Sequence, residues 1–335
     1  MALHRRVGLS LLILYGVGVM VGAGIYVLVG KVAGVAGALT PLSFVVAGVA
    51  AALSALSFAE LSARIPESAG EAAYVRTAFG IGWLGDCVGV AVACVGVISA
   101  AAILKGGVGY IAALVDMPRF WLEILVGLLL GFIALVGVLE SLVFAAVLTL
   151  VEIVGLLLIV GAGFSAEPVT PFVEMVDFGS LLHGGGPMLL AAALLAFFAL
   201  VFETGTGWSP DTIIVIAIFA TLNGVLAQIV MAARVLYGLG RRNRLFAWAH
   251  ATSDRLGTPV AATAVVTLII VVLALSAPIE KLAQVTTYIL LCIFVVVNLA
   301  LLVLKRRVPT PAGAPDVHWT VPVIAIVFSL VLLFS

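Results

Sequence analysis

Charged side chains are scarce in this sequence. Its 335 residues include 16 Lys and Arg and 16 Asp and Glu, which is 10% of the chain, whereas hydrophobic residues make up 64%. A soluble domain carries charge on about a quarter of its residues, so this composition excludes an ordinary soluble protein. In lipid, only helices or closed barrels satisfy every backbone group internally. Long apolar runs without alternation favour helices over barrel strands.

Cysteine and histidine are also scarce. The three cysteines all lie in apolar runs, which favours buried thiols over a disulfide framework, and the four histidines show no metal-ligand spacing. No Walker-type phosphate loop, His/Glu metal motif or Gly-x-Ser-x-Gly elbow occurs. The net charge of zero disfavours a nucleic-acid partner. The sequence therefore predicts neither an enzyme nor a resident metal or cofactor.

About ten apolar segments are long enough, or nearly long enough, to cross a bilayer, which takes about 20 residues. The first lacks a small-residue cleavage site and is expected to be retained as a helix. The segments are 9–30, 40–62, 83–114, 121–139, 142–163, 187–203, 212–238, 260–277, 283–304 and 319–335.

Basic residues orient the first half of the chain, because cytoplasmic loops retain Lys and Arg. Arg5 and Arg6 place the N-terminus in the cytoplasm, and alternate crossing then puts Arg64 and Arg76 there as well. The 164–186 loop has acidic residues and no Lys or Arg, and falls outside. The first five spans are therefore self-consistent.

The second half conflicts with this count. Basic clusters at 241–255 and 305–307 both favour the cytoplasm, so the segment from 212 must enter from outside, as 187–203 also does. Either 187–203 is a half-helix that re-enters from outside, or the whole second half violates the charge rule. We prefer the re-entrant interpretation, because 187–203 is near the lower length limit for a span.

The first apolar segment is rich in glycine, at positions 16, 18, 22, 24 and 30. Each glycine inside a helix costs about 1 kcal/mol relative to alanine, so the cluster needs a reason. One is close packing of transmembrane helices on small residues. The other is a helix broken at mid-membrane, whose free N–H groups from Gly22 to Ile25 face a carboxylate.

The residues after the second segment add a second motif, with Glu60-Leu-Ser followed by Pro66, Gly70 and Tyr74. Alone, it would be a solvated turn. Together with the glycine-rich segment, it resembles the amino acid permeases of the amino acid-polyamine-organocation superfamily. Residues 197–203 resemble the sixth helix of that family, residues 220–240 the eighth, and Thr258-Pro259 the start of the next.

This resemblance implies an all-α integral membrane protein with a five-plus-five inverted repeat and broken helices one and six. Residues 1–163 would form the first repeat, 164–186 an extracellular loop, and 187–304 an incomplete second repeat with helices 6a, 8, 9 and 10. Residues 305–335 would form a cytoplasmic basic loop and helix 11. Compared with the family, the second half of helix six, helix seven and helix twelve are missing, which leaves the inverted symmetry incomplete.

The resemblance also implies a substrate site. Gly22, Ala23, Gly24 and Ile25 would bind a substrate carboxylate. Phe198, Ala199 and Phe202 would offer carbonyl groups and apolar surface. Phe198 and Phe202 share a helix face, so packing or lipid contact explains them equally well.

Glu152 lies in the middle of the fifth segment. A carboxylate at that depth is either functional or a protonated, hydrogen-bonded structural group. Some proton-coupled relatives carry a lysine near this position, so Glu152 reverses the charge and is our candidate coupling residue for H⁺ or Na⁺. Lys105 is expected to snorkel to the outer interface, and Asn223 and Gln228 to bond neighbouring helices or the substrate.

Glu60 and Arg64 are predicted to face the cytoplasm. They can pair with Arg234 as an inner gate, or form an exposed loop pair worth under about 1 kcal/mol. The sequence thus predicts a secondary transporter of amino acids or related amines in the cell membrane, with its oligomeric state unknown. The alternative is a family member that does not transport and acts as a scaffold or subunit.

Overall fold

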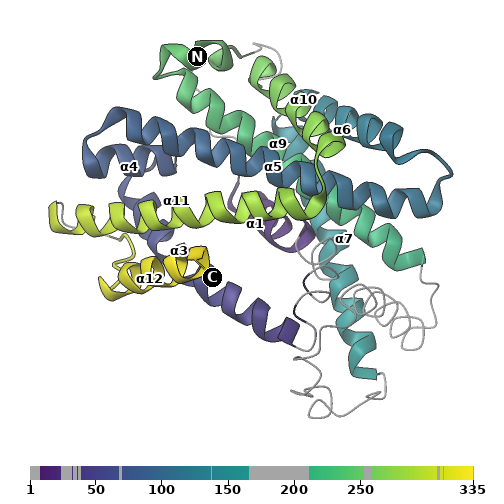
Figure 1. Ribbon diagram of the computed structural model, residues 1–335, viewed down its shortest axis with the longest axis horizontal. Helices are drawn as coiled ribbons and strands as arrows, with labels where there is room; N and C mark the ends of the chain where they lie inside the picture. Colours follow the sequence, from purple (N-terminus) through teal and green to yellow (C-terminus); the bar gives the residue numbers. More distant parts are fainter. Residues whose placement is uncertain are drawn as a thin grey trace. The chain divides into compact units, whose positions relative to one another are not determined.

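The computed structural model describes residues 8–23, 32, 36, 39–67, 70–136, 138–165, 211–252, 258–307, 310–311 and 313–334, and every long element in these ranges is a helix (Figure 1). The helices are α1 (Leu9–Ala23), α3 (Thr40–Arg64), α4 (Glu71–Phe79), α5 (Gly82–Leu114), α6 (Arg119–Val136), α7 (Val138–Ser165), α9 (Asp211–Gly240), η4 (Arg244–His250), α10 (Val260–Ser276), α11 (Ile279–Arg307) and α12 (Thr320–Phe334).

The predicted apolar segments coincide with helices wherever the structure describes them. Five helices are long and apolar enough to cross a bilayer, namely α3, α5, α6, α9 within Ile214–Gly240, and α11. Shorter apolar stretches lie in α1, α7, α10 and α12. The segment 187–203 lies outside the described residues. The prediction of an all-helical membrane protein is confirmed, whereas the inverted repeat and the missing helix stay predictions.

The chain forms two compact units that interleave in the sequence. Unit 1 comprises Met1–Val45, Ile103–Val126 and Leu139–Ala227, and unit 2 comprises Val46–Ala102, Gly127–Val138 and Gln228–Ser335. Each unit draws on both predicted repeats. The unit limits fall inside α3, α5, α6, α7 and α9, so these helices contribute residues to both units.

The motif from Glu60 to Tyr74 is not a single loop, and that expectation was wrong. Glu60 and Arg64 form the last turn of α3, and Glu71 begins the separate short helix α4. The αL conformation of Gly80 ends α4. With nine residues α4 is far too short to span a bilayer, and it forms because one face is buried on unit 2.

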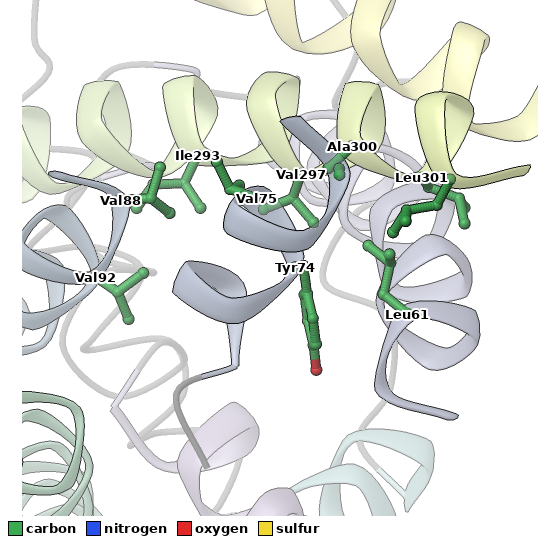
Figure 2. Close-up of a cluster of buried hydrophobic side chains, with 11 residues drawn as sticks. Leu61, Tyr74, Val75, Val88, Val92, Ile293, Val297, Ala300 and Leu301 are labelled. Atoms are coloured by element: carbon green, nitrogen blue, oxygen red, sulfur yellow. The ribbon is translucent and has the colours of Figure 1, made fainter. Parts of the chain in front are cut away.

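The buried face of α4 joins a cluster of buried hydrophobic side chains in unit 2 (Figure 2). Tyr74 and Val75 lie among side chains of α3, α5 and α11, including Leu61, Val88 and Val297. Burial, together with the nearby Glu71 carboxylate, raises the pKa of Tyr74 to about 12. The same core packs α4 against α11, and α12 packs beside α11 (Figure 1).

Helix α10 shows how these helices suit lipid. Its inward face carries Thr263 and Thr267, whose hydroxyl groups donate to the carbonyl groups one turn earlier at 3.1 and 2.9 Å. Its outward face exposes Leu268, Ile269 and Val272. The backbone bonds satisfy the two buried hydroxyl groups without water, and the outward face presents an apolar surface to the acyl chains.

A glycine lets α6 approach α10 closely. A Cβ atom added at Gly131 would lie 2.3 Å from Thr267 Cγ2 and 2.6 Å from its Oγ1. By contrast, a Cβ at Gly48 in α3 would have nothing within 4 Å. Gly131 is therefore a packing requirement and Gly48 is not.

We predict that Gly131→Ala destabilises the protein by about 1–3 kcal/mol, because the methyl group overpacks the α6–α10 contact. Gly48→Ala should be neutral or stabilising by up to about 1 kcal/mol, since alanine is the better helix former. Thermal unfolding in detergent measures both changes. Thr267→Ala should partly restore Gly131→Ala, and equal stability of the two glycine variants would contradict the packing argument.

Candidate functional site

A buried polar cluster lies in unit 1, between α7 and α9. The Asn223 side-chain amide donates to Thr149 Oγ1 at 3.0 Å and to Glu152 Oε1 at 3.3 Å. All three side chains are fully or almost fully buried. Thr149 and Glu152 are three residues apart, so α7 presents both on one face. We call Thr149, Glu152 and Asn223 the Glu152 cluster.

Helix α1 touches this cluster through a glycine. A Cβ at Gly18 would lie 2.0 Å from Thr149 Oγ1 and 2.5 Å from Asn223 Nδ2. Nearby, the Tyr15 hydroxyl donates to the carbonyl of Ala227 at 3.0 Å, one helical turn after Asn223. The close-packing interpretation of the glycine-rich segment is therefore confirmed at Gly18.

The cluster carries more acceptors than donors. The Thr149 hydroxyl donates to the carbonyl of Ala145 at 2.9 Å. Within the described residues, Glu152 Oε2 and Asn223 Oδ1 have no hydrogen-bond partner. Buried acceptors of this kind need a donor or a cation nearby. A proton on Glu152 supplies a donor, and a small hard cation would be held by the same oxygens.

The predicted substrate residues lie mostly outside the described residues. Gly22 and Ala23 form the end of α1 as described, with Gly22 four residues, or about 6 Å, along the helix from Gly18. Gly24, Ile25, Phe198, Ala199 and Phe202 fall in the ranges that the structure does not describe. The predicted helix break at Gly22–Ile25 therefore stays a prediction.

A second polar site lies in unit 2, around Glu60. Arg64 Nη2 lies 2.7 Å and Lys305 Nζ 2.9 Å from Glu60 Oε1, and the backbone N–H of Val317 donates to Oε2 at 2.9 Å. Glu60 is fully buried. Its carboxylate therefore joins the ends of α3 and α11 to the segment that precedes α12.

Two further residues extend this site, which we call the Glu60 network. Arg64 donates to Thr310 Oγ1 at 2.7 Å, and Asp316 accepts from Lys305 at 2.6 Å and from Thr310 at 3.1 Å. The hydrogen bonds from Lys305 and Thr310, with the positive charge of Lys305, lower the pKa of Asp316 below its ordinary value. Asp316 therefore remains ionised to lower pH than an isolated aspartate.

The alternative of an exposed loop pair is wrong, because Glu60 and Arg64 are buried and helical. Sequence reasoning missed Lys305, Thr310 and Asp316 as partners. The basic cluster 305–307 was a signal for topology, but nothing in it pointed to a residue about 245 positions earlier in the chain. Arg234 lies in α9, half-buried in unit 2, and its pairing with Glu60 stays a prediction.

Other polar residues found partners that the sequence did not reveal. Lys105 Nζ of α5 lies 3.7 Å from Glu123 Oε1 of α6, so its ammonium group has a carboxylate beside it. The prediction that Lys105 extends to the outer interface did not include this partner. Asn223 bonds a neighbouring helix, as one of the two interpretations expected. In unit 2, Asp86 accepts from Arg76 at 2.6 Å and from Asn243 at 2.9 Å.

Metal chemistry has little support in the described residues. They contain no group of three or more His, Cys, Asp or Glu side chains that could hold a metal ion. The two polar sites differ in their charges. The Glu152 cluster is a single buried carboxylate among neutral groups, and the Glu60 network is a set of ion pairs.

Comparison with known proteins adds one result. A family model described as amino acid permease matches residues 8–209 and residues 186–335, so the two matches together cover most of the chain and overlap at 186–209. No curated protein matches the chain.

We predict that Glu60→Gln destabilises the protein by about 3–5 kcal/mol, because removing one partner of a buried ion pair leaves the other charges uncompensated. Glu67→Gln is the matched control. Glu67 pairs with Arg242, but both side chains are about 40% exposed, so its loss should cost under about 1 kcal/mol. Denaturant or thermal unfolding in detergent compares the stabilities of the two variants. Similar losses of stability would show that burial of the Glu60 network does not add to its contribution.

Proposed function

The chain belongs to the amino acid permease family, and on that basis we propose that it is a secondary active transporter. It moves amino acids or related amines across the cell membrane by alternating access. The observation that carries this proposal is the match of the family model over most of the chain, on a fold whose described helices are apolar enough for a bilayer. The family is one of transporters, not enzymes.

Substrate binding is proposed for the region around the end of α1. Gly22, Ala23, Gly24 and Ile25 would offer backbone N–H groups to the substrate carboxylate, which the positive end of a half-helix also favours. Phe198, Ala199 and Phe202 would complete the site from the sixth family helix. The contact of α1 at Gly18 with the Glu152 cluster supports this proposal, because it shows that α1 lies next to buried polar groups of unit 1.

The repeat structure is part of the proposal. We place helices one to five in residues 1–163 and an incomplete second repeat in 187–304, without the second half of helix six and helix seven. One observation supports a discontinuity there, namely that the positive charges leave one crossing unaccounted for.

The Glu152 cluster is the proposed coupling site. An ionised carboxylate is costly inside a membrane protein unless it is paired, and within the described residues Glu152 has only the amide of Asn223 as a hydrogen-bond donor. Binding a proton removes the charge and supplies the donor that the cluster lacks. Na⁺ is the alternative ion, since the free oxygens of Glu152 and Asn223 are hard ligands.

The inner gate is proposed to involve Glu60, Arg64 and Arg234. Its support is the Glu60 network, which joins α3, α11 and the segment before α12 at a buried carboxylate. Exposed tryptophans support a location of these ends at a membrane interface. Trp83, Trp248 and Trp319 lie at the start of α5, after α9 and before α12, as expected of residues at a membrane interface.

The competing function is a family member that does not transport. It follows from the proposed loss of helix seven, because alternating access needs two matched repeats. Such a protein would keep its fold and its buried polar sites, but would act as a membrane scaffold or subunit.

We expect proteoliposomes of the full chain to take up a labelled amino-acid mixture. Gly24→Leu should lower the rate about tenfold or more, because its side chain would keep the carboxylate away from the backbone N–H groups, and a lost bond to a charged group costs about 1.5–3 kcal/mol. Gly16→Leu is the matched control, since a Cβ at Gly16 meets nothing within 4 Å. Uptake no faster than in empty liposomes, from a chain that is folded, would favour the non-transporting alternative.

We predict that uptake by the unmodified chain rises as the outer solution is acidified, and that Glu152→Gln removes this dependence because glutamine cannot take up a proton. Glu123→Gln, a second buried carboxylate in unit 1 but one paired with Lys105, should keep the pH profile. Measuring uptake against external pH, with and without Na⁺, tests both ions. An unchanged profile in Glu152→Gln would rule out proton coupling at this residue.

A further inference from the structure

The short helix η4, between α9 and α10, has three distinct rows of side chains. A 3₁₀-helix has three residues per turn, so residues three apart share a row. Phe246 and Ala249 form the inward row, with Phe246 half-buried and Ala249 fully buried. Ala249 packs with Ala233 of α9 and Ala262 of α10. The inward row therefore fixes η4 on the two helices that it connects.

The turn that leads into η4 is equally constrained. A Cβ at Gly240 would lie 2.4 Å from the carbonyl oxygen of Phe246, so η4 folds tightly against the end of α9. Asn243 accepts a hydrogen bond from the N–H of Leu245 at 3.0 Å and donates to Asp86 at 2.9 Å. The two outward rows of η4 therefore have a fixed direction.

One outward row is apolar and the other is basic. Leu245 is 79% exposed and Trp248 is 43% exposed. Arg244, Ala247 and His250 form the other row, and all three are exposed. A large apolar side chain and an indole on the surface, beside a basic row, are the pattern of segments that lie in a membrane interface.

Two arginines at this segment have no ion-pair partner among the described residues. Arg242 pairs with Glu67. Arg241 and Arg244 are exposed and, within the described part of the chain, make no ion pair or hydrogen bond. Guanidinium groups bind phosphate oxygens in a bidentate manner. Two unpaired guanidinium groups beside an apolar row thus have the complementary charge for an anionic headgroup.

We propose that Arg241, Arg244, Leu245 and Trp248 form a binding surface for anionic phospholipid. Leu245 and Trp248 enter the boundary between headgroups and acyl chains, and Arg241 and Arg244 bind the headgroup phosphate. Lipid is the expected occupant because of where η4 lies in the chain. It follows α9, which ends at Gly240, and precedes α10, which begins at Val260, and both helices are apolar enough to enter the bilayer. The surface does not depend on the proposed transport activity.

The surface can be tested with Trp248 as the probe. In the full chain, Trp83, Trp121, Trp208 and Trp319 are replaced by Phe, which leaves Trp248 as the only tryptophan. The protein is reconstituted in vesicles of four parts phosphatidylcholine and one part phosphatidylglycerol, with bromine on the acyl chains of one lipid at a time. Quenching of Trp248 by each brominated lipid then reports which lipid is its neighbour.

We expect brominated phosphatidylglycerol to quench Trp248 more than its share of the bilayer predicts. Each arginine near an anionic surface contributes an attraction that corresponds to about fivefold in local enrichment. Arg241→Gln and Arg244→Gln should each lower the enrichment by up to that factor, and lysine at the same positions should restore much of it. Arg306→Gln, an equal loss of charge at the exposed end of α11, should leave it unchanged.

Three outcomes would overturn the proposal. Quenching by phosphatidylglycerol in proportion to its share shows no preference for anionic lipid. An enrichment that survives both Gln variants places the anion elsewhere, and no quenching by either lipid means that η4 faces water or protein. The unmodified chain provides a second readout, because native mass spectrometry should show retained phosphatidylglycerol that Arg241→Gln/Arg244→Gln loses while Arg306→Gln keeps it.

Discussion

The absence of water from the bilayer interior is the constraint on which the rest of this structure depends. It requires helices, because they satisfy their backbone groups locally, and it allows large apolar side chains on the outer surface as well as in the core. Leu268 and Val272 of α10 face outward, while Thr263 and Thr267 face inward and bond the preceding turn. The few polar side chains must then find partners inside the protein, and this requirement shapes both polar sites.

The two sites meet that requirement differently, and the difference fits different roles. Glu60 is a buried carboxylate with two cations and a backbone N–H around it. Such a fully paired group holds elements together, since separating its partners is costly. Glu152 has only the amide of Asn223 and retains a free oxygen within the described residues. An incompletely satisfied carboxylate can respond to a proton or an ion, which suits a coupling site.

Much of the fold could be read from the sequence, because hydropathy is a local property. The run of apolar residues predicted α5 to within a residue at its start. The positive charges at 241–244 and 305–307, which were assigned to loops, lie just after α9 and in the last turn of α11. The short elements were missed. Helix α4 and η4 are stable because Tyr74 and Val75, or Ala249, are buried by other helices, and no local pattern of apolar residues reports that burial.

What the sequence determined by itself is the class of protein: a helical membrane protein, with the approximate limits of its apolar segments, the motifs of a permease, and Glu152 as a carboxylate at membrane depth. Only the tertiary structure decided the partners. Asn223 is the partner of Glu152, and Lys305 and Val317 are partners of Glu60. In each case the partner lies at least 71 residues away in the sequence. The physical reason is that lipid solubility depends on each segment's own composition, whereas a buried charge is satisfied by whichever groups packing brings within hydrogen-bond distance.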